Sequence, residues 1–280
     1  MRRPSTLSLI FSYAILVLGV LFSLYPIWFA FLAALRPGGR LFTLNLAGMF
    51  FPTEITWENF RIMLFEKPFP IWIKNSLFIA GLTTIACVSL STSGAFAFSR
   101  FRFVGREAGL ILFLAVQAFP GVLALVPIAL ILTRLGLYGS PWGLILAYST
   151  GTLVFCTWNL KGYFDTIPID LEEAGMIDGC GPIQSFIRIA LPLARPALAT
   201  TALFGFMAGW NEYVMASVLL AGQEPRYTLP IALAQMASDL NVPWGQYAAG
   251  ALLVSIPVVL LFLWLQKYLE SGLTMGGVKG

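Results

Sequence analysis

Residues 170–196 read DLEEAGMIDGCGPIQSFIRIALPLARP and form a polar stretch between two long hydrophobic runs. Asp170, Glu172 and Glu173 stand where a helix would begin, and negative charge is favourable at the positive end of a helix dipole. Gly179 is the expected end of this helix, because the position after a helix commonly takes a left-handed backbone that glycine adopts without strain. The pattern predicts a short helix that stops at a glycine turn.

A second helix is expected to begin at Gly181-Pro182, because proline suits the first turn of a helix. Phe186 and Ile189 lie three residues apart and therefore on one face. Pro192 is expected to prevent this helix from running straight into the next hydrophobic run. The whole segment is predicted to be a helix, a sharp turn and a second helix.

The composition sets the class of protein. Hydrophobic residues make up 58% of the chain and charged residues 11%, with a mean hydropathy of +0.83, which a soluble domain of this length could not accommodate on its surface. Runs of about 20 apolar residues are long enough to cross a bilayer as helices. They predict an all-α polytopic membrane protein with six transmembrane helices, at residues 7–35, 71–98, 108–135, 141–160, 196–220 and 248–269.

The basic residues of the short connecting segments predict the orientation of the chain, since such residues concentrate on the cytoplasmic side. They are Arg2, Arg3, Arg100, Arg102, Arg106, Lys161, Arg188, Lys267 and Lys279. Both termini are therefore expected in the cytoplasm, together with the loop at 161–195 and the tail at 271–280. The loop at 222–247 is expected outside.

Absent residues exclude several classes of function. The sequence contains no histidine, so it cannot build Ser–His or Cys–His nucleophiles or histidine-based metal sites. It also contains no G-x-x-x-x-G-K-[ST] phosphate loop, because Gly280 rather than Ser or Thr follows Lys279. We expect no catalytic residue, no metal site, no cofactor and no nucleic-acid partner.

The 170–196 segment resembles the EAA motif of ABC importer permeases, a cytoplasmic loop gripped by an ATPase subunit. The matching residues are Glu173, Ala174, Asp178, Gly179, Phe186, Ile189, Leu191, Pro192, Leu193 and Pro196. Gly175 replaces the second Ala of the motif, at a cost to the helix of up to about 1 kcal/mol, and Cys180 replaces a further Ala. The resemblance implies ATPase-coupling roles for Glu172, Glu173, Ala174, Gly175, Asp178, Gly179, Phe186 and Pro192.

Most of the chain resembles the smaller permease of carbohydrate-type importers, such as the maltose, trehalose and glycerol-phosphate systems. The matching pieces are Asn59-Phe60, Asn75-Ser76, Ala95, Ala97 to Arg100, Pro120, Trp210 to Glu212, and the glycine-rich ending. The resemblance implies a type I ABC importer permease fold over residues 1–280, in the plasma (inner) membrane of a prokaryote. The implied partners are a second permease, an ATPase dimer that binds ATP and Mg, and an extracytoplasmic solute-binding protein. The implied solute is a sugar, such as a disaccharide or oligosaccharide.

Trp210, Asn211 and Glu212 are candidates for the substrate path. They lie about 15 residues into the fifth predicted span, roughly 20 Å from its inner end at 1.5 Å per residue. An indole beside an amide and a carboxylate suits a sugar, but the same groups could instead hydrogen bond between helices. The outer loop at 222–247 has two interpretations as well: it reaches toward the binding protein, or its apolar part at 229–237 lies along the membrane surface.

Two alternatives to a sugar permease remain open from the sequence. A secondary transporter usually carries buried carboxylates and an internal repeat, whereas here only Glu212 lies well inside a predicted span and no convincing repeat is present. An ABC permease for another solute, such as glycerol phosphate, is the second alternative.

Overall fold

The computed structural model describes residues 6–39, 50–51, 54–238 and 240–276, and these residues are helical apart from short connections. Their contacts divide the chain into two units. The first contains Met1–Pro70 and Ala232–Ile256, and the second contains Ile71–Ile231 and Pro257–Gly280. The prediction of an all-α fold is confirmed.

In the first unit, a short segment after α1 (Thr6–Leu35) folds back against the helix. This segment contains α3 (Glu58–Arg61) and a π-helical turn, η2 (Ile62–Glu66). The buried amide of Asn59 holds the fold, since its Nδ2 donates to the carbonyls of Ala34 at 2.8 Å and Arg36 at 3.0 Å. The carbonyls near the end of α1 are thus satisfied by a side chain.

The ends of α13 (Leu229–Ser238) and the start of α14 (Trp244–Gly276) complete the first unit. Gly250 on α14 lies so close to its neighbours that a Cβ would stand 2.8 Å from Leu233 Cδ2 and 2.9 Å from Met63 Cε. Both atoms are the ends of flexible side chains, so the glycine leaves room for Leu233 and Met63 to pack against α14.

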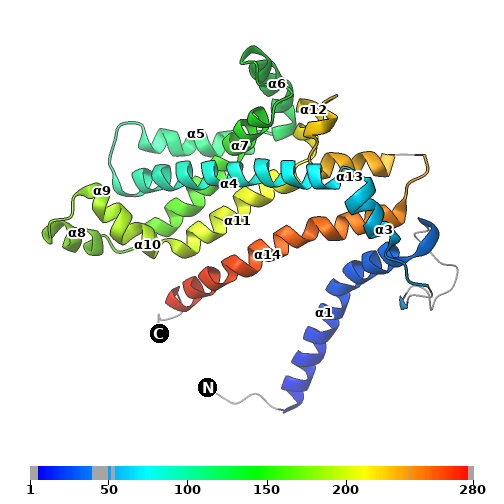
Figure 1. Ribbon diagram of the computed structural model, residues 1–280. Coiled ribbons are helices and arrows are strands. Elements are labelled where there is room, and N and C mark those ends of the chain that lie inside the picture. The colour runs from blue at the N-terminus through cyan, green and yellow to red at the C-terminus, as the bar shows by residue number, and fades with distance from the viewer. Residues whose placement is uncertain (1–5, 40–49, 52–53, 239, 277–280) are drawn as a thin grey trace. The chain divides into compact units, whose positions relative to one another are not determined.

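The second unit is built around three long helices, α4 (Phe69–Arg100), α7 (Pro141–Thr166) and α11 (Arg195–Asn211), which run alongside one another in Figure 1. Helices associate in lipid through close packing of small residues. Gly209 of α11 illustrates this, because a Cβ there would lie 2.9 Å from Ala80 Cα on α4. Phe155 of α7 contacts Phe204 of α11 edge to face, with 5.1 Å between ring centroids.

Shorter helices connect these three. They are α5 (Arg106–Ala118), η3 (Gly121–Ala124), α6 (Leu125–Arg134), α8 (Asp170–Ile177), α9 (Pro182–Ser185), η4 (Phe186–Ala190), α10 (Leu191–Leu193), α12 (Val214–Leu219) and η5 (Glu224–Arg226). In Figure 1, α8 and α9 lie at one end of this unit, and α6 and α12 lie at the other.

Among the described residues, four helices are long and apolar enough to cross a membrane unbroken: Leu7–Leu35, Phe69–Arg100, Pro141–Thr166 and Trp244–Leu269. The other two predicted spans are broken helices, and the described residues provide up to six spans when each bent helix pair counts as one. In the span predicted at 108–135, Phe119 is extended and Pro120 follows it, and the two helical halves are bent by 94°. Proline lacks an amide hydrogen and disfavours helical backbone in the residue before it, which explains the break.

The span predicted at 196–220 is also interrupted. Helix α11 ends at Asn211, Glu212 has an extended backbone, and α12 begins at Val214. The predicted 222–247 loop is more ordered than a simple connection, since it contains the ten-residue helix α13. The predicted tail at 271–280 continues α14 as far as Gly276, and residues 277–280 lie outside the described part of the chain.

Candidate functional site

The predicted helix, turn and helix are present at residues 170–193. Helix α8 ends at Ile177, and Gly179 takes a positive φ of 93°, so the predicted left-handed turn is confirmed. The Gly179 amide donates to the Met176 carbonyl at 3.1 Å, which closes the end of α8. Gly181 then caps α9, and its amide donates to the Gln184 side chain at 3.4 Å.

As the sequence predicts, the second helix does not run straight into the next hydrophobic run. It continues to Leu193 and turns at Ala194, so that Pro182–Leu193 and Arg195–Asn211 are bent by 78°. A π-helical turn at Phe186–Ala190 precedes Pro192. This wider turn relieves the clash that a proline ring makes with the carbonyl four residues earlier.

Phe186 anchors the second helix to the rest of the unit. Its ring lies 4.4 Å from Phe96 of α4 and 6.4 Å from Phe164 of α7, measured between centroids. Phe96 and Phe164 also contact each other edge to face at 5.6 Å. Each such pair stabilises the packing by about 0.5–1.5 kcal/mol beyond the area that it buries. Phe186 therefore holds the second helix of the loop against α4 and α7.

Gly175, one departure from the EAA pattern, faces the second helix. A Cβ at this position would overlap Cδ1 of Ile189 on the second helix. The glycine therefore gives the Ile189 side chain room against α8, and the two helices of the loop pack closely.

Glu172 is buried, with 3% of its side chain exposed, and its Oε1 lies 2.7 Å from Nε of Arg100 on α4. Arg100 Nη2 also donates to the Ile167 carbonyl at 2.9 Å. Close by, Asp165 accepts hydrogen bonds from Ser99 and Lys161, each at 2.6 Å. The sequence had assigned Glu172 to coupling but had given no role to this inward ion pair. The position of Arg100 at the end of an apolar run was the feature of the sequence that could have indicated this ion pair.

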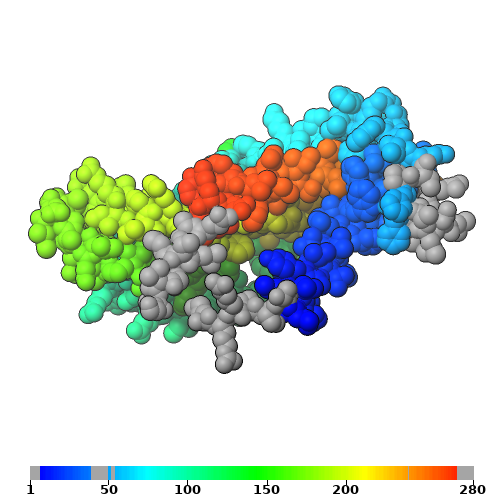
Figure 2. All heavy atoms as spheres, turned by 90° about the horizontal axis from the view of Figure 1, so that it is seen from below, coloured from blue at the N-terminus to red at the C-terminus, as the bar shows by residue number. Residues whose placement is uncertain are grey.

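The outer face of the loop is apolar at several points. Ile177 is 86% exposed, Ile183 is 74% exposed and Ile187 is 53% exposed. In the space-filling view, the residues of α8–α10, coloured green to yellow, lie at an extremity of the second unit (Figure 2). An exposed apolar group rimmed by polar residues is typical of a protein-binding surface.

The remaining predicted coupling residues fall around this face. Glu173, Ala174, Asp178 and Gly179 are exposed, whereas Gly175 and Pro192 are partly buried. The sequence reasoning missed the three exposed isoleucines, because an isolated isoleucine in a short helix gives no sign of which way it faces.

The three candidate residues of the substrate path lie where α11 ends. Trp210 is buried and stacks on Phe206 at 5.2 Å between ring centroids. Asn211 is exposed, and its Nδ2 approaches Met207 Sδ at 3.9 Å. These two neighbours on one helix thus have different surroundings.

Glu212 holds together the break between α11 and α12. Its Oε1 accepts from the Met215 amide at 2.8 Å, and its Oε2 accepts from the Ala216 amide at 3.0 Å. The Tyr148 hydroxyl of α7 donates to the same Oε2 at 2.6 Å. A carboxylate at a helix N-terminus satisfies amides that have no partner within the helix. Glu212 makes the interhelical hydrogen bond that the sequence left open as an alternative.

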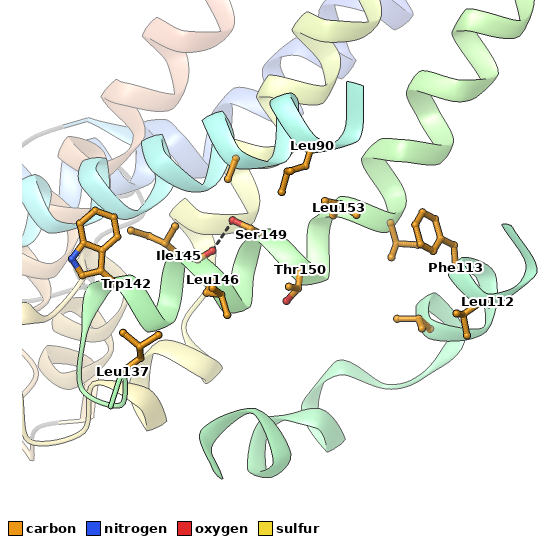
Figure 3. A pocket seen from close by; sticks show the side chains of 13 residues that line it. Leu90, Leu112, Phe113, Leu137, Trp142, Ile145, Leu146, Ser149, Thr150 and Leu153 are labelled. Atoms are coloured by element: carbon orange, nitrogen blue, oxygen red, sulfur yellow. Dashed lines mark hydrogen bonds between the residues drawn. The ribbon is translucent and has the colours of Figure 1, made fainter. Parts of the chain in front are cut away.

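A cavity of about 550 Å³ lies between α4, α5 and α7. Figure 3 shows Trp142 and Leu137 toward one end and Phe113 and Leu112 toward the other. Ser149 lines it, but its hydroxyl donates to the Ile145 carbonyl of its own helix at 2.6 Å. The cavity therefore presents an apolar surface, which suits lipid or an apolar side chain better than a sugar.

A second cavity, of about 470 Å³, adjoins the two helix breaks. Gln117 and Phe119 line it at the end of α5, Thr150 and Gly151 line it on α7, and Met215 lines it on α12. It combines an amide, an aromatic ring and backbone at an interrupted helix, a combination often found where transporters bind solutes.

No group of three or more Cys, Asp or Glu side chains in the described part of the chain could hold a metal ion. Residues 89–275 match the family described as binding-protein-dependent transport system inner membrane component. This match includes both helices of the 170–193 loop. The chain is a binding-protein-dependent ABC transport permease.

Relatives of this permease match over almost its whole length. The galactooligosaccharides transport system permease protein GanQ of Bacillus subtilis is 37% identical, covering 100% of this chain and 99% of GanQ. The maltose/maltodextrin permease MalG of Salmonella typhimurium is 38% identical, covering 99% of this chain and 98% of MalG. A crystal structure of a bacterial ABC transporter involved in the import of alginate matches with a TM-score of 0.80 and 25% identity, covering 96% of this chain and 99% of that one.

These matches confirm the predicted fold class and the predicted family. The permease is a multi-pass inner membrane protein, and as the membrane component of its system it carries no catalytic site for ATP hydrolysis. The alternative of a secondary transporter is thereby excluded.

Proposed function

We propose that this permease imports an oligosaccharide, delivered by an extracytoplasmic binding protein and driven by ATP hydrolysis on a partner subunit. The observation that carries the proposal is full-length similarity, at 37–38% identity, to permeases named for galactooligosaccharides and maltodextrin. The structural relative is named for the import of an acidic polysaccharide, which is likewise a chain of sugar units.

The complex is proposed to contain a second permease, two ATPase subunits and the binding protein. The exposed face of α8 and α9 is suited to the ATPase, because Ile177 and Ile183 offer apolar surface beside the carboxylates of Glu173 and Asp178. Apolar contacts supply most of the affinity in such surfaces, and the charges at their rim supply orientation. Glu172, Gly175, Phe186 and Pro192 are proposed to shape this face rather than to touch the ATPase.

For the solute path, Asn211 and the 470 Å³ cavity are the favoured candidates. The exposed amide of Asn211, the amide of Gln117 and the hydroxyl of Thr150 offer hydrogen-bonding groups, and Phe119 offers an aromatic face. Trp210 and Glu212 are proposed to hold these elements in place. The outer loop is proposed to contact the binding protein through the connection between α13 and α14, where Leu240 is fully exposed.

Uptake by the complex in proteoliposomes tests the proposal. The permease is purified with the second permease, ATPase and binding protein encoded beside it. ATP is enclosed in the vesicle lumen, and transport is measured for complexes whose ATPase subunits face the lumen. We expect ATP-dependent uptake of maltotriose or galactotriose, with no uptake of glycerol 3-phosphate. Uptake of glycerol 3-phosphate in place of both sugars would contradict the assignment of the solute.

A further inference from the structure

Arg100 makes an unusually complete set of contacts for the last residue of a long helix. Its side chain is 10% exposed, and Nε, Nη2 and Nη1 reach Glu172 at 2.7 Å, the Ile167 carbonyl at 2.9 Å and the Ser99 hydroxyl at 3.1 Å. These partners belong to α8, to the connection after α7, and to α4 itself. The guanidinium group thus connects the end of α4 both to α8, through Glu172, and to the connection that leads into α8, through Ile167.

A second ion pair extends the contacts to α7. Ser99 donates to Asp165, and Lys161 donates to the other oxygen of the same carboxylate. Two positive and two negative side chains therefore balance at the end of α4. We refer to Arg100, Glu172, Ser99, Asp165 and Lys161 as the Arg100 junction.

The opposite end of α4 is also held by polar contacts. Asn75 Nδ2 donates to the carbonyls of Pro225 and Tyr227, each at 3.0 Å. The buried Ser76 hydroxyl accepts from the amide of Leu229 at 2.8 Å. These contacts hold the beginning of the 222–247 segment, which lies about 37 Å along α4 from Arg100 at 1.5 Å per residue.

We propose that α4 mechanically connects the α8–α9 loop with the 222–247 segment, and that Arg100 is the positioning residue that fastens α8 to it. The proposal rests on the function proposed above, in which an ATPase holds the first segment and a binding protein contacts the second. A displacement of α8 then moves α4, and α4 carries the displacement to the residues that it holds at Asn75 and Ser76. Coupling between distant sites requires such an element with differential contacts at both ends.

The energetics of buried ion pairs favour this role over simple stabilisation. Removing one partner leaves an unpaired buried charge, whereas replacing both partners by apolar residues of similar size is often neutral for folding. The pair therefore adds less to stability than to the fixed position of α8. A variant that removes both charges separates the two roles, because it preserves folding and removes the directional hydrogen bonds.

The test uses the double variant R100M/E172M in the complete complex. Its control is E58M/R61M, which removes an ion pair within α3 whose side chains are 50% and 55% exposed, and in which Arg61 also contacts Glu66. R100K is a third variant, since a single ammonium group does not reproduce the planar fork of arginine. Copurification of the ATPase and thermal stability of the complex show whether each variant folds and assembles.

Two measurements then report on coupling. Spin labels at cysteines introduced for Ser89 on α4 and Asp170 on α8, with the three native cysteines replaced by alanine, give the distance between these helices. We expect a narrow distance that is the same in nucleotide-free and vanadate-trapped complexes, and a broadened or state-dependent distance in R100M/E172M. Stimulation of ATP hydrolysis by the binding protein should fall at least about fivefold in that variant, fall to a smaller extent in R100K, and stay unchanged in E58M/R61M.

Retention of both the narrow distance and full stimulation in R100M/E172M would overturn the proposal. Loss of stimulation with an unchanged α4–α8 distance would also overturn it, since the junction would then not fix α8. The distance is measurable in the permease alone, so failure of the ATPase to copurify with the native permease would count against the proposed function and not against the junction.

Discussion

Gly179 offers a sharp test of how the turn between α8 and α9 supports function. Its φ of 93° is reserved largely for glycine, and a Cβ placed on it would meet nothing within 4 Å. Any penalty from Gly179→Ala is therefore conformational and not steric. Gly181, two residues later, has a φ of −71° and equally open surroundings.

These angles give the magnitudes. Alanine in the left-handed region costs about 1–2 kcal/mol, which lowers the population of the native turn about fivefold to thirtyfold relative to alternative turns. Proline is confined to φ near −65° and would also remove the Gly179 amide that donates to Met176, at a cost of about 3 kcal/mol or more. Gly181→Ala requires no change of backbone and should be nearly neutral.

The assay measures ATP hydrolysis by the purified complex in lipid, with and without liganded binding protein. The amount of permease inserted in the membrane is measured in parallel. We expect activity to fall in the order native and Gly181→Ala, then Gly179→Ala, then Gly179→Pro. Insertion should persist in all of them, because the turn lies outside the membrane helices. Full stimulation of the Gly179→Pro complex would refute the claim that this turn presents the coupling surface.

Three further predictions address packing and topology. Gly209→Ala should destabilise the permease by about 1–3 kcal/mol through overpacking. Gly205→Ala should be tolerated, because its Cβ would lie 3.4 Å from the nearest atom. Equal thermal stability of the two variants would contradict the close approach of α11 to α4. Asn59→Leu should lower stability by about 2–6 kcal/mol, since it leaves two buried carbonyls without their donor; an unchanged denaturation temperature would show that these bonds are dispensable. In a variant without native cysteines, an impermeant thiol reagent should reach a cysteine at Gln184 only from the cytoplasm and one at Gln223 only from outside, and the reverse pattern would invert the topology.

The sequence predicted the local features of the 170–193 loop because they depend on residues close together in the chain. Gly179 and Gly181-Pro182 set the turn and the restart of the helix through their own backbone preferences. The direction in which a side chain points was not predictable in the same way. Glu172 and Glu173 are adjacent acidic residues in the sequence, and only the position of Arg100 distinguishes the buried one from the exposed one.

The two interrupted spans show a similar limit. The apolar run at 108–135 has the composition of one transmembrane helix, and hydropathy alone does not reveal a bend of 94°. Pro120 indicated a possible break in this helix, because proline inside a helix commonly kinks or ends it. Glu212 also indicated a break, because a lone carboxylate in an apolar run needs hydrogen-bond donors. Its donors are the Tyr148 hydroxyl and two amides of the following helix.

Photocrosslinking from the 170–193 loop identifies the subunit that this loop contacts. A photoreactive phenylalanine analogue replaces Ile177, the most exposed apolar residue of α8, and a second variant carries it at Leu240 as the matched exposed position in the outer segment. We expect irradiation of membranes to link residue 177 to the ATPase subunit, and we expect no such product from residue 240. A crosslink between residue 240 and the ATPase would contradict the assignment of the 170–193 loop as the ATPase-coupling site. So would the lack of a crosslink between residue 177 and the ATPase in an assembled and active complex.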